Sequence, residues 1–115
     1  MNAIRNSNVT VMVKSMDRSV RFYTRTLGFK LKSRYGNYWA EVKAPGLTIG
    51  LHPIGKKVKV GDNLSMGFGV QDFRKAVKTL EKKGIRFREY DDEWVRLAYF
   101  HDPDKNVLYL VETKK

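Results

Sequence analysis

The sequence predicts an α+β protein made of two copies of one small module, each containing a strand, a helix and three further strands. Apolar residues recur at helical spacing in two stretches and alternate with polar residues in several shorter ones. Tight turns separate the strands that follow each helix, which favours antiparallel hairpins over a parallel sheet. Gly28 and Gly84, which end the two helical stretches, lie about half of the 115-residue chain apart. The order βαβββ therefore occurs twice.

The first module is predicted to be organised around a helix that begins at Met16. Met16, Val20, Tyr23 and Leu27 form one apolar stripe of this helix, and Gly28 provides its left-handed C-terminal cap. Asp17, in the first turn, suits the positive end of the helix dipole. Strands are predicted before and after this helix, over residues 8–14, 29–34, 38–43 and 47–52.

The second module repeats this pattern after a connector rich in glycine and lysine. Asp72 is a suitable N-cap for the second helix, and Gly84 ends it. The apolar stripe consists of Phe73, Ala76, Val77 and Leu80. Strands are predicted over residues 64–70, 85–90, 95–100 and 107–112. The predicted division of the single domain is module one over 1–53, a linker over 54–62 and module two over 63–115.

Composition limits the possible classes of protein. The chain has no cysteine, no apolar run long enough to span a membrane and no signal-peptide core at its start, so we expect a cytoplasmic protein without a membrane partner. Its net charge of +11 invites comparison with nucleic-acid-binding proteins. The basic residues are spread along the chain and form no recognised motif, so nucleic acid is not the expected partner.

Several local motifs resemble one known family. These are Val13 to Tyr23, then Leu27-Gly28-Phe29, and Phe100 to Asp104 before the last strand. They are similar to motifs of the vicinal oxygen chelate superfamily, which includes glyoxalase I, extradiol dioxygenases, fosfomycin-resistance enzymes and bleomycin-binding proteins. The resemblance covers essentially the whole chain. It implies that the strands curl as a mostly antiparallel sheet around a cavity, usually in a homodimer.

The resemblance also implies where a divalent metal would be bound. Family members commonly place histidine or a carboxylate at four strand positions, which fall here on Asn8, Gly50, Ser65 and Tyr109. Only Asn8 keeps a ligand oxygen of the usual kind on its side chain. We therefore expect no metal and no cofactor, and the sequence leaves open whether the protein is an enzyme.

Two histidines and one glutamate are the remaining candidates for acid–base chemistry. His52 shares a strand face with Gly50 and is the candidate general acid or base, because imidazole titrates near neutral pH. A hydrogen-bonded or solvated role is the alternative for this strand-end residue. His101 is expected to be structural or exposed, and Glu41 to be exposed or ion-paired.

Small and aromatic residues around the implied cavity suggest a ligand site. Gly50, Ser65, Gly67 and Gly69 lack large side chains and could leave volume on the sheet. Alternatively, Tyr109 and nearby aromatic residues, including Tyr38 and Tyr99, fill that space or form a dimer contact. The predicted ligand-binding residues are Asn8, Thr10, Met12, Trp39, Gly50, His52, Ser65, Gly67, Trp94 and Tyr109.

Three classes of function remain open. The first is a metal-independent protein that sequesters a small neutral or anionic, aromatic molecule, and the basic charge favours such a ligand. The second is a divergent lyase, isomerase or dioxygenase that uses non-standard site residues. The third is a basic interaction protein or a nucleic-acid-binding dimer.

Overall fold

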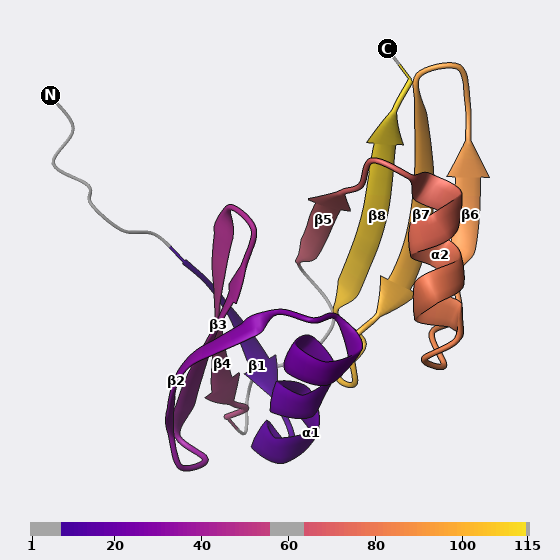
Figure 1. Ribbon diagram of the computed structural model, residues 1–115. Helices are drawn as coiled ribbons and strands as arrows, with labels where there is room; N and C mark the ends of the chain where they lie inside the picture. Colours follow the sequence, from indigo (N-terminus) through magenta and orange to yellow (C-terminus); the bar gives the residue numbers. More distant parts are fainter. Residues whose placement is uncertain (1–7, 56–63, 115) are drawn as a thin grey trace, which may run out of the picture. The chain divides into compact units, whose positions relative to one another are not determined.

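A computed structural model of the protein describes residues 8–55 and 64–114. The chain divides into two compact units, residues 1–60 and 61–115, and each is described by itself (Figure 1). The predicted linker over 54–62 lies outside the described residues from position 56 onward. Of the helices in the described residues, none is long and apolar enough to cross a membrane.

The first unit is a four-stranded sheet with one helix against it. The strands have the order β1-β4-β3-β2, in which β2–β3 and β3–β4 are antiparallel and β1 is parallel to β4. The elements are β1 (Val9–Val13), α1 (Met16–Arg21), a π-helical segment (Phe22–Thr26), β2 (Lys30–Tyr35), β3 (Trp39–Ala44) and β4 (Leu47–Pro53).

The second unit repeats this topology. The strand order is β5-β8-β7-β6, with β5 parallel to β8 and the other two pairs antiparallel. The elements are β5 (Ser65–Gly69), α2 (Phe73–Glu81), β6 (Arg88–Asp91), β7 (Val95–His101) and β8 (Val107–Thr113). The duplicated α+β order and the mostly antiparallel pairing are confirmed. The strands form two open sheets, while the cavity and the homodimer stay predictions.

Each sheet has one face covered by its own helix and one face that the helix leaves open (Figure 1). In the first unit α1 packs on β3 and β4, and Tyr23 is fully buried. Alternate strand residues supply the rest of this core: Val11, Val13, Ala40, Val42, Ala44, Ile49 and Leu51. In the second unit the core includes Met66, Phe73, Val77, Ala98, Phe100, Leu108 and Leu110. The residues between them in each strand form the open faces.

The first helix differs from its prediction in its second half. It begins with Ser15 as N-cap, whose Oγ accepts a hydrogen bond from the Arg18 backbone N–H at 3.1 Å. After Arg21 the chain widens into π-helical hydrogen bonding, and the Leu27 N–H donates to the Phe22 carbonyl at 3.0 Å. Gly28, with φ of +81°, ends the helix as predicted. Apolar spacing does not distinguish one wide turn from an α-helical turn.

The second helix ends and begins as predicted, but the strand after it starts later. Asp72 Oδ1 accepts from the Lys75 backbone N–H at 3.1 Å, and Gly84 has φ of +94°. A strand was expected from residue 85, whereas β6 begins at Arg88. Before it, the Phe87 ring packs edge-on against Phe100 with centroids 5.2 Å apart, so core packing decides the path of this segment.

Candidate functional site

On the open face of the first unit, the indole of Trp39 lies over Gly50. A Cβ atom placed on Gly50 would stand 2.9 Å from Cζ2 of Trp39 and 3.1 Å from Oγ1 of Thr10. The indole therefore occupies the space that a larger residue at position 50 would need. At Gly50 the missing side chain leaves room that the Trp39 ring fills.

Glu41 fixes the orientation of this indole. Trp39 Nε1 donates a hydrogen bond to Glu41 Oε2 at 3.1 Å, and Lys32 Nζ lies 3.7 Å from Glu41 Oε1. The expected ion-paired role of Glu41 is confirmed. Glu41 is also part of the Trp39 site, which the sequence did not show because the facing of this strand was ambiguous.

Most of the predicted first-unit residues come together around Trp39. Strand register places Thr10 beside Gly50 and Met12 beside His52. The His52 ring lies 6.3 Å from the Trp39 ring at an interplanar angle of 68°. Asn8 Oδ1 accepts from Thr10 Oγ1 at 3.4 Å, a long hydrogen bond at the exposed end of the group. These residues form a half-buried aromatic surface with a few polar groups at its edge.

His52 has a definite tautomer in this arrangement. Its Nδ1 lies 2.7 Å from the Pro53 carbonyl oxygen, and since a carbonyl can only accept, Nδ1 donates. In the neutral ring Nε2 is then the acceptor. This exposed side chain can accept a hydrogen bond from a ligand beside Trp39, or serve as a base there.

The second unit contains a similar ring-on-glycine contact. A Cβ atom at Gly67 would lie 2.6 Å from Oη of Tyr109, so the phenol ring covers this glycine. Tyr99 lies on the neighbouring strand, with its ring centroid 5.6 Å from that of Tyr109. By contrast, the corresponding point at Gly69 has no atom of another described residue within 4 Å, apart from its two chain neighbours. Ser65, on the same strand face, is exposed.

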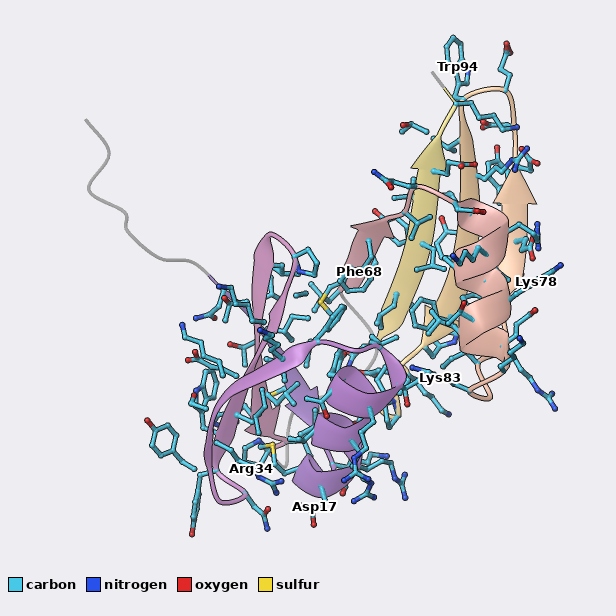
Figure 2. All side chains as sticks on the ribbon, viewed as in Figure 1. Asp17, Arg34, Phe68, Lys78, Lys83 and Trp94 are labelled. Atoms are coloured by element: carbon cyan, nitrogen blue, oxygen red, sulfur yellow. The ribbon has the colours of Figure 1, made fainter. Side chains whose placement is uncertain are left out.

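Trp94 and Tyr38 both lie in turns, between β6 and β7 and between β2 and β3, and they are 69% and 81% exposed. The strand expected from residue 38 begins at Trp39, so Tyr38 lies outside it. Figure 2 shows Trp94 at the turn end of the second unit. Tyr109 pairs with Tyr99, in the middle of β7, so Trp94 is not part of that cluster. The residues of a hairpin turn lie outside the backbone hydrogen-bond ladder of the two strands. The alternation of apolar and polar residues in the sequence did not show where each turn lies.

The family metal positions hold a donor set that does not suit a divalent cation. Gly50 has no side chain and is covered by Trp39, while Tyr109 lies with its ring on Gly67. Asn8 and Ser65 supply one neutral oxygen ligand each. Hard and borderline cations in proteins use carboxylates and imidazoles at such sites. In the described part of the chain, no three His, Asp or Glu side chains cluster to hold a metal.

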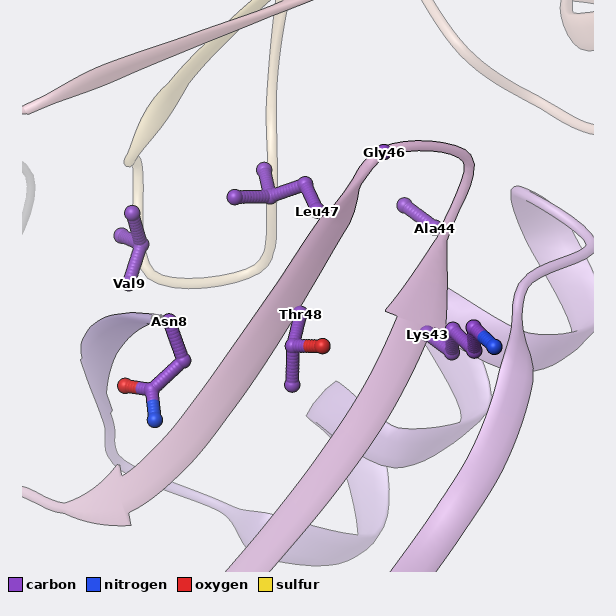
Figure 3. Close-up of a pocket in the computed structure, with 7 residues that line it drawn as sticks. All are labelled: Asn8, Val9, Lys43, Ala44, Gly46, Leu47 and Thr48. Carbon is purple, nitrogen blue, oxygen red and sulfur yellow. The ribbon is translucent and has the colours of Figure 1, made fainter. Parts of the chain in front are cut away.

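Two pockets involve residues that the sequence analysis did not select. The first has a volume of about 330 Å³, and Figure 3 shows its lining by Asn8, Val9, Lys43, Ala44, Gly46, Leu47 and Thr48. The second, of about 490 Å³, lies in the second unit and is lined by Arg86, Phe87, Arg88, Tyr99, His101 and Val107. The period-two spacing of Tyr99 and His101 on β7 could have indicated their shared face.

Each unit has the order βαβββ and a sheet with one helix-covered and one open face. The protein therefore belongs, by its fold, to the class of proteins built from paired βαβββ modules. The chain belongs to the Glyoxalase/Bleomycin resistance protein/Dioxygenase superfamily, whose family model matches residues 6–110.

Similar proteins agree with this assignment. An uncharacterized protein of Mycolicibacterium smegmatis is 35% identical over 107 residues, covering 87% of this chain and 86% of its own length. The crystal structure of TnmS3, an antibiotic binding protein from a Streptomyces species, matches with a TM-score of 0.81 and 25% identity over 98% of this chain and 99% of that chain. A glyoxalase/bleomycin resistance protein/dioxygenase from Nocardioides matches with a TM-score of 0.76 over 97% and 86% of the chains; at 21% identity it shows the fold alone.

Proposed function

We propose that this protein is a metal-independent binding protein that sequesters a small aromatic molecule. The observation that supports it is that aromatic rings occupy two of the four positions at which the resemblance implies metal ligands. The Trp39 ring covers Gly50, and Tyr109 is itself the residue at another of these positions. Flat rings with a few polar groups at their edge are typical of small-molecule sites and contribute stacking energy.

The charge of the chain favours a neutral or anionic ligand over a cationic one. The net charge is +11, and a positive surface raises the local concentration of anions while repelling cations. We propose the open sheet face of each unit as a separate binding surface. In the first unit it is formed around Thr10, Trp39 and His52, and in the second around Gly67 and Tyr109. A cytoplasmic homodimer is part of the same proposal.

One solved relative supports a binding role. TnmS3, which is 25% identical with a TM-score of 0.81, is described as an antibiotic binding protein. Superfamily membership is also compatible with catalysis, and His52 Nε2 beside Trp39 is the group that would act as a base in a divergent enzyme. Binding is the better-supported proposal because, among the described residues, no three His, Asp or Glu side chains cluster to hold a metal ion that would activate a water.

The test is a thermal-shift panel of aromatic acids, neutral aromatic molecules and antibiotics. A ligand that binds only the folded state, present at about ten times its Kd, raises Tm by roughly 6 °C. We expect Trp39→Leu to abolish this shift, whereas the matched substitution Trp94→Leu, at the exposed turn, preserves it. Loss in both variants, or in neither, would contradict the proposed location of the site.

Metal independence is tested separately. The purified protein is dialysed against Ni²⁺, Zn²⁺, Mn²⁺ or Fe²⁺ and its metal content is then measured. Stoichiometric metal that is lost on substitution of Asn8 would overturn the metal-free proposal. Ligand turnover that disappears in His52→Gln, with binding retained, would favour the enzyme instead.

A further inference from the structure

The pocket at the start of β6 in the second unit combines positive charge with aromatic surface. It has a volume of about 490 Å³, within the usual size of small-ligand pockets. Arg88, Tyr99 and His101 reach it from the open face of the sheet, where Arg88 pairs with Tyr99 across β6 and β7. Arg86 and Phe87 reach it from the segment before β6. None of the described residues that line this pocket is acidic.

The two arginines of this pocket lack the partners that other arginines of the unit have. Arg74 forms a two-point ion pair with Glu89, at 2.9 and 3.1 Å, and Arg96 lies 3.6 Å from Glu112. Arg88 pairs with Tyr99 through the β6–β7 backbone ladder, but the guanidinium groups of Arg86 and Arg88 have no hydrogen-bond or ion-pair partner among the described residues. Alternation along β6 explains the difference, because Arg88 faces the pocket and Glu89 faces α2.

The aromatic wall of the pocket on the open face is Tyr99, whose ring centroid lies 5.6 Å from that of Tyr109. The Phe87 ring packs edge-on against the buried Phe100 at 5.2 Å and fixes the segment before β6. A braced ring presents flat surface at low entropic cost to a ligand. Arginine guanidinium groups are planar and bind carboxylate or phosphate oxygens through two parallel hydrogen bonds. The pocket thus offers a place for a ring and a place for an oxyanion side by side.

We propose that this pocket, with Arg86 and Arg88 as its anion-binding residues and His101 as a third donor, binds the carboxylate or phosphate of an aromatic anion. The ring of the ligand lies against Tyr99. This inference rests on the proposed small-molecule function and deepens it, since it selects anionic over neutral ligands and assigns the residues that recognise the charge.

The experiment uses two probes of nearly equal shape, 1-naphthoate and 1-naphthamide, titrated into the full-length protein and followed by NMR of the arginine Nε–Hε groups. We expect naphthoate to shift the Arg86 and Arg88 signals and to bind at least about tenfold more tightly than naphthamide. The double variant Arg86→Gln/Arg88→Gln should lose about tenfold in affinity for naphthoate and little for naphthamide. Arg18→Gln/Arg21→Gln on α1 is the control, because it removes two exposed arginines and the same charge.

The outcomes separate this inference from the proposed function. Equal affinity for naphthoate and naphthamide would overturn the inference. An equal loss of naphthoate affinity in the control variant would also overturn it, since the positive charge would then act only at long range. Equal affinity for inorganic phosphate and naphthoate would overturn the role of the rings. If another aromatic compound of the thermal-shift panel binds at Trp39 while naphthoate does not bind here, the proposed function stands and this inference fails. If both arginine signals shift but no panel compound depends on Trp39, the pocket stands and the Trp39 site fails.

Discussion

The indole of Trp39 on β3 occupies the position that a side chain at Gly50 on β4 would fill. A Cβ atom there would lie 2.9 Å from Cζ2 of Trp39, closer than real Cβ contacts. The resemblance to the superfamily implies a metal-ligand position at residue 50, where this chain has a glycine covered by the ring of a tryptophan. The two residues act as one unit, because the ring can lie flat only while position 50 has no side chain.

Gly50→Ala should therefore destabilise the protein. The added methyl group displaces a half-buried indole that is held by Glu41, at an expected cost of about 1–3 kcal/mol. Urea unfolding followed by circular dichroism measures the change. In a Trp39→Leu background the same substitution should cost less, which a double-mutant cycle reveals as a coupling energy. If the two substitutions change the free energy of unfolding additively, the Trp39 ring moves away from position 50 without cost.

Gly69→Ala is the matched control for that substitution. Both glycines lie on open sheet faces, but nothing lies within 4 Å of a Cβ atom at Gly69, and its φ is not positive. The free energy of unfolding should change by no more than about 0.5 kcal/mol. A loss as large as that of Gly50→Ala would mean that the cost comes from glycine replacement in a strand and not from Trp39.

The buried turn after β7 depends on Asp102. Its Oδ1 accepts from the backbone N–H groups of Asp104 and Asn106, and its Oδ2 accepts from Asn106 Nδ2, each at 2.9 Å. Asp102→Ala leaves these buried donors without their acceptor and should cost at least about 2 kcal/mol. Asp102→Asn keeps one acceptor oxygen for the two backbone groups and should cost less. Equal chemical-denaturation midpoints for all three proteins would refute this role.

Asp92 gives the β6–β7 turn a measurable pH dependence. The Val95 and Trp94 backbone N–H groups, at 2.9 and 2.7 Å from Oδ1, lower the pKa of this carboxyl, with a further contribution from Tyr90. Because the folded pKa lies below the unfolded one, the stabilisation is present above the unfolded pKa and is lost as pH falls through the folded pKa. The urea midpoint should fall between about pH 5.5 and pH 3 in the wild type, and less steeply in Asp92→Asn. Arg34 lowers the pKa of Asp17 and Arg74 lowers the pKa of Glu89, and both effects are present in the wild type and in the variant. Identical slopes of the two proteins would therefore contradict a separate contribution from Asp92.

The N-cap of α2 is a local source of stability. Asp72→Ala removes the acceptor for the Lys75 backbone N–H and should cost about 0.5–2 kcal/mol, whereas Asp72→Ser retains a capping oxygen and should stay within a few tenths. Thermal unfolding of the three proteins distinguishes these values. A serine variant as unstable as the alanine variant would show that the charge, and not the cap, is what matters.

The sequence by itself determined the features that depend on neighbours along the chain. The apolar stripes placed both helices, Asp72 and Gly84 set the limits of α2, and Gly28 ended the first helix in the left-handed conformation. Period-two alternation located the strands to within a few residues, and their family motifs placed the chain in its superfamily. These signals are local, since helix capping, turn geometry and side-chain facing are governed by residues a few positions apart.

The tertiary structure decided what lies on the strand faces. The pairing of β3 with β4 brings Trp39 over Gly50, and the register of β5 and β8 brings Tyr109 over Gly67. The space beside these two glycines, which the sequence suggested to be empty, is therefore occupied by aromatic rings. The pairing of β6 with β7 likewise places Arg88 beside Tyr99, while Glu89 forms an ion pair with Arg74. Such contacts join residues distant in sequence, and their geometry follows from strand register and packing, which no local pattern encodes.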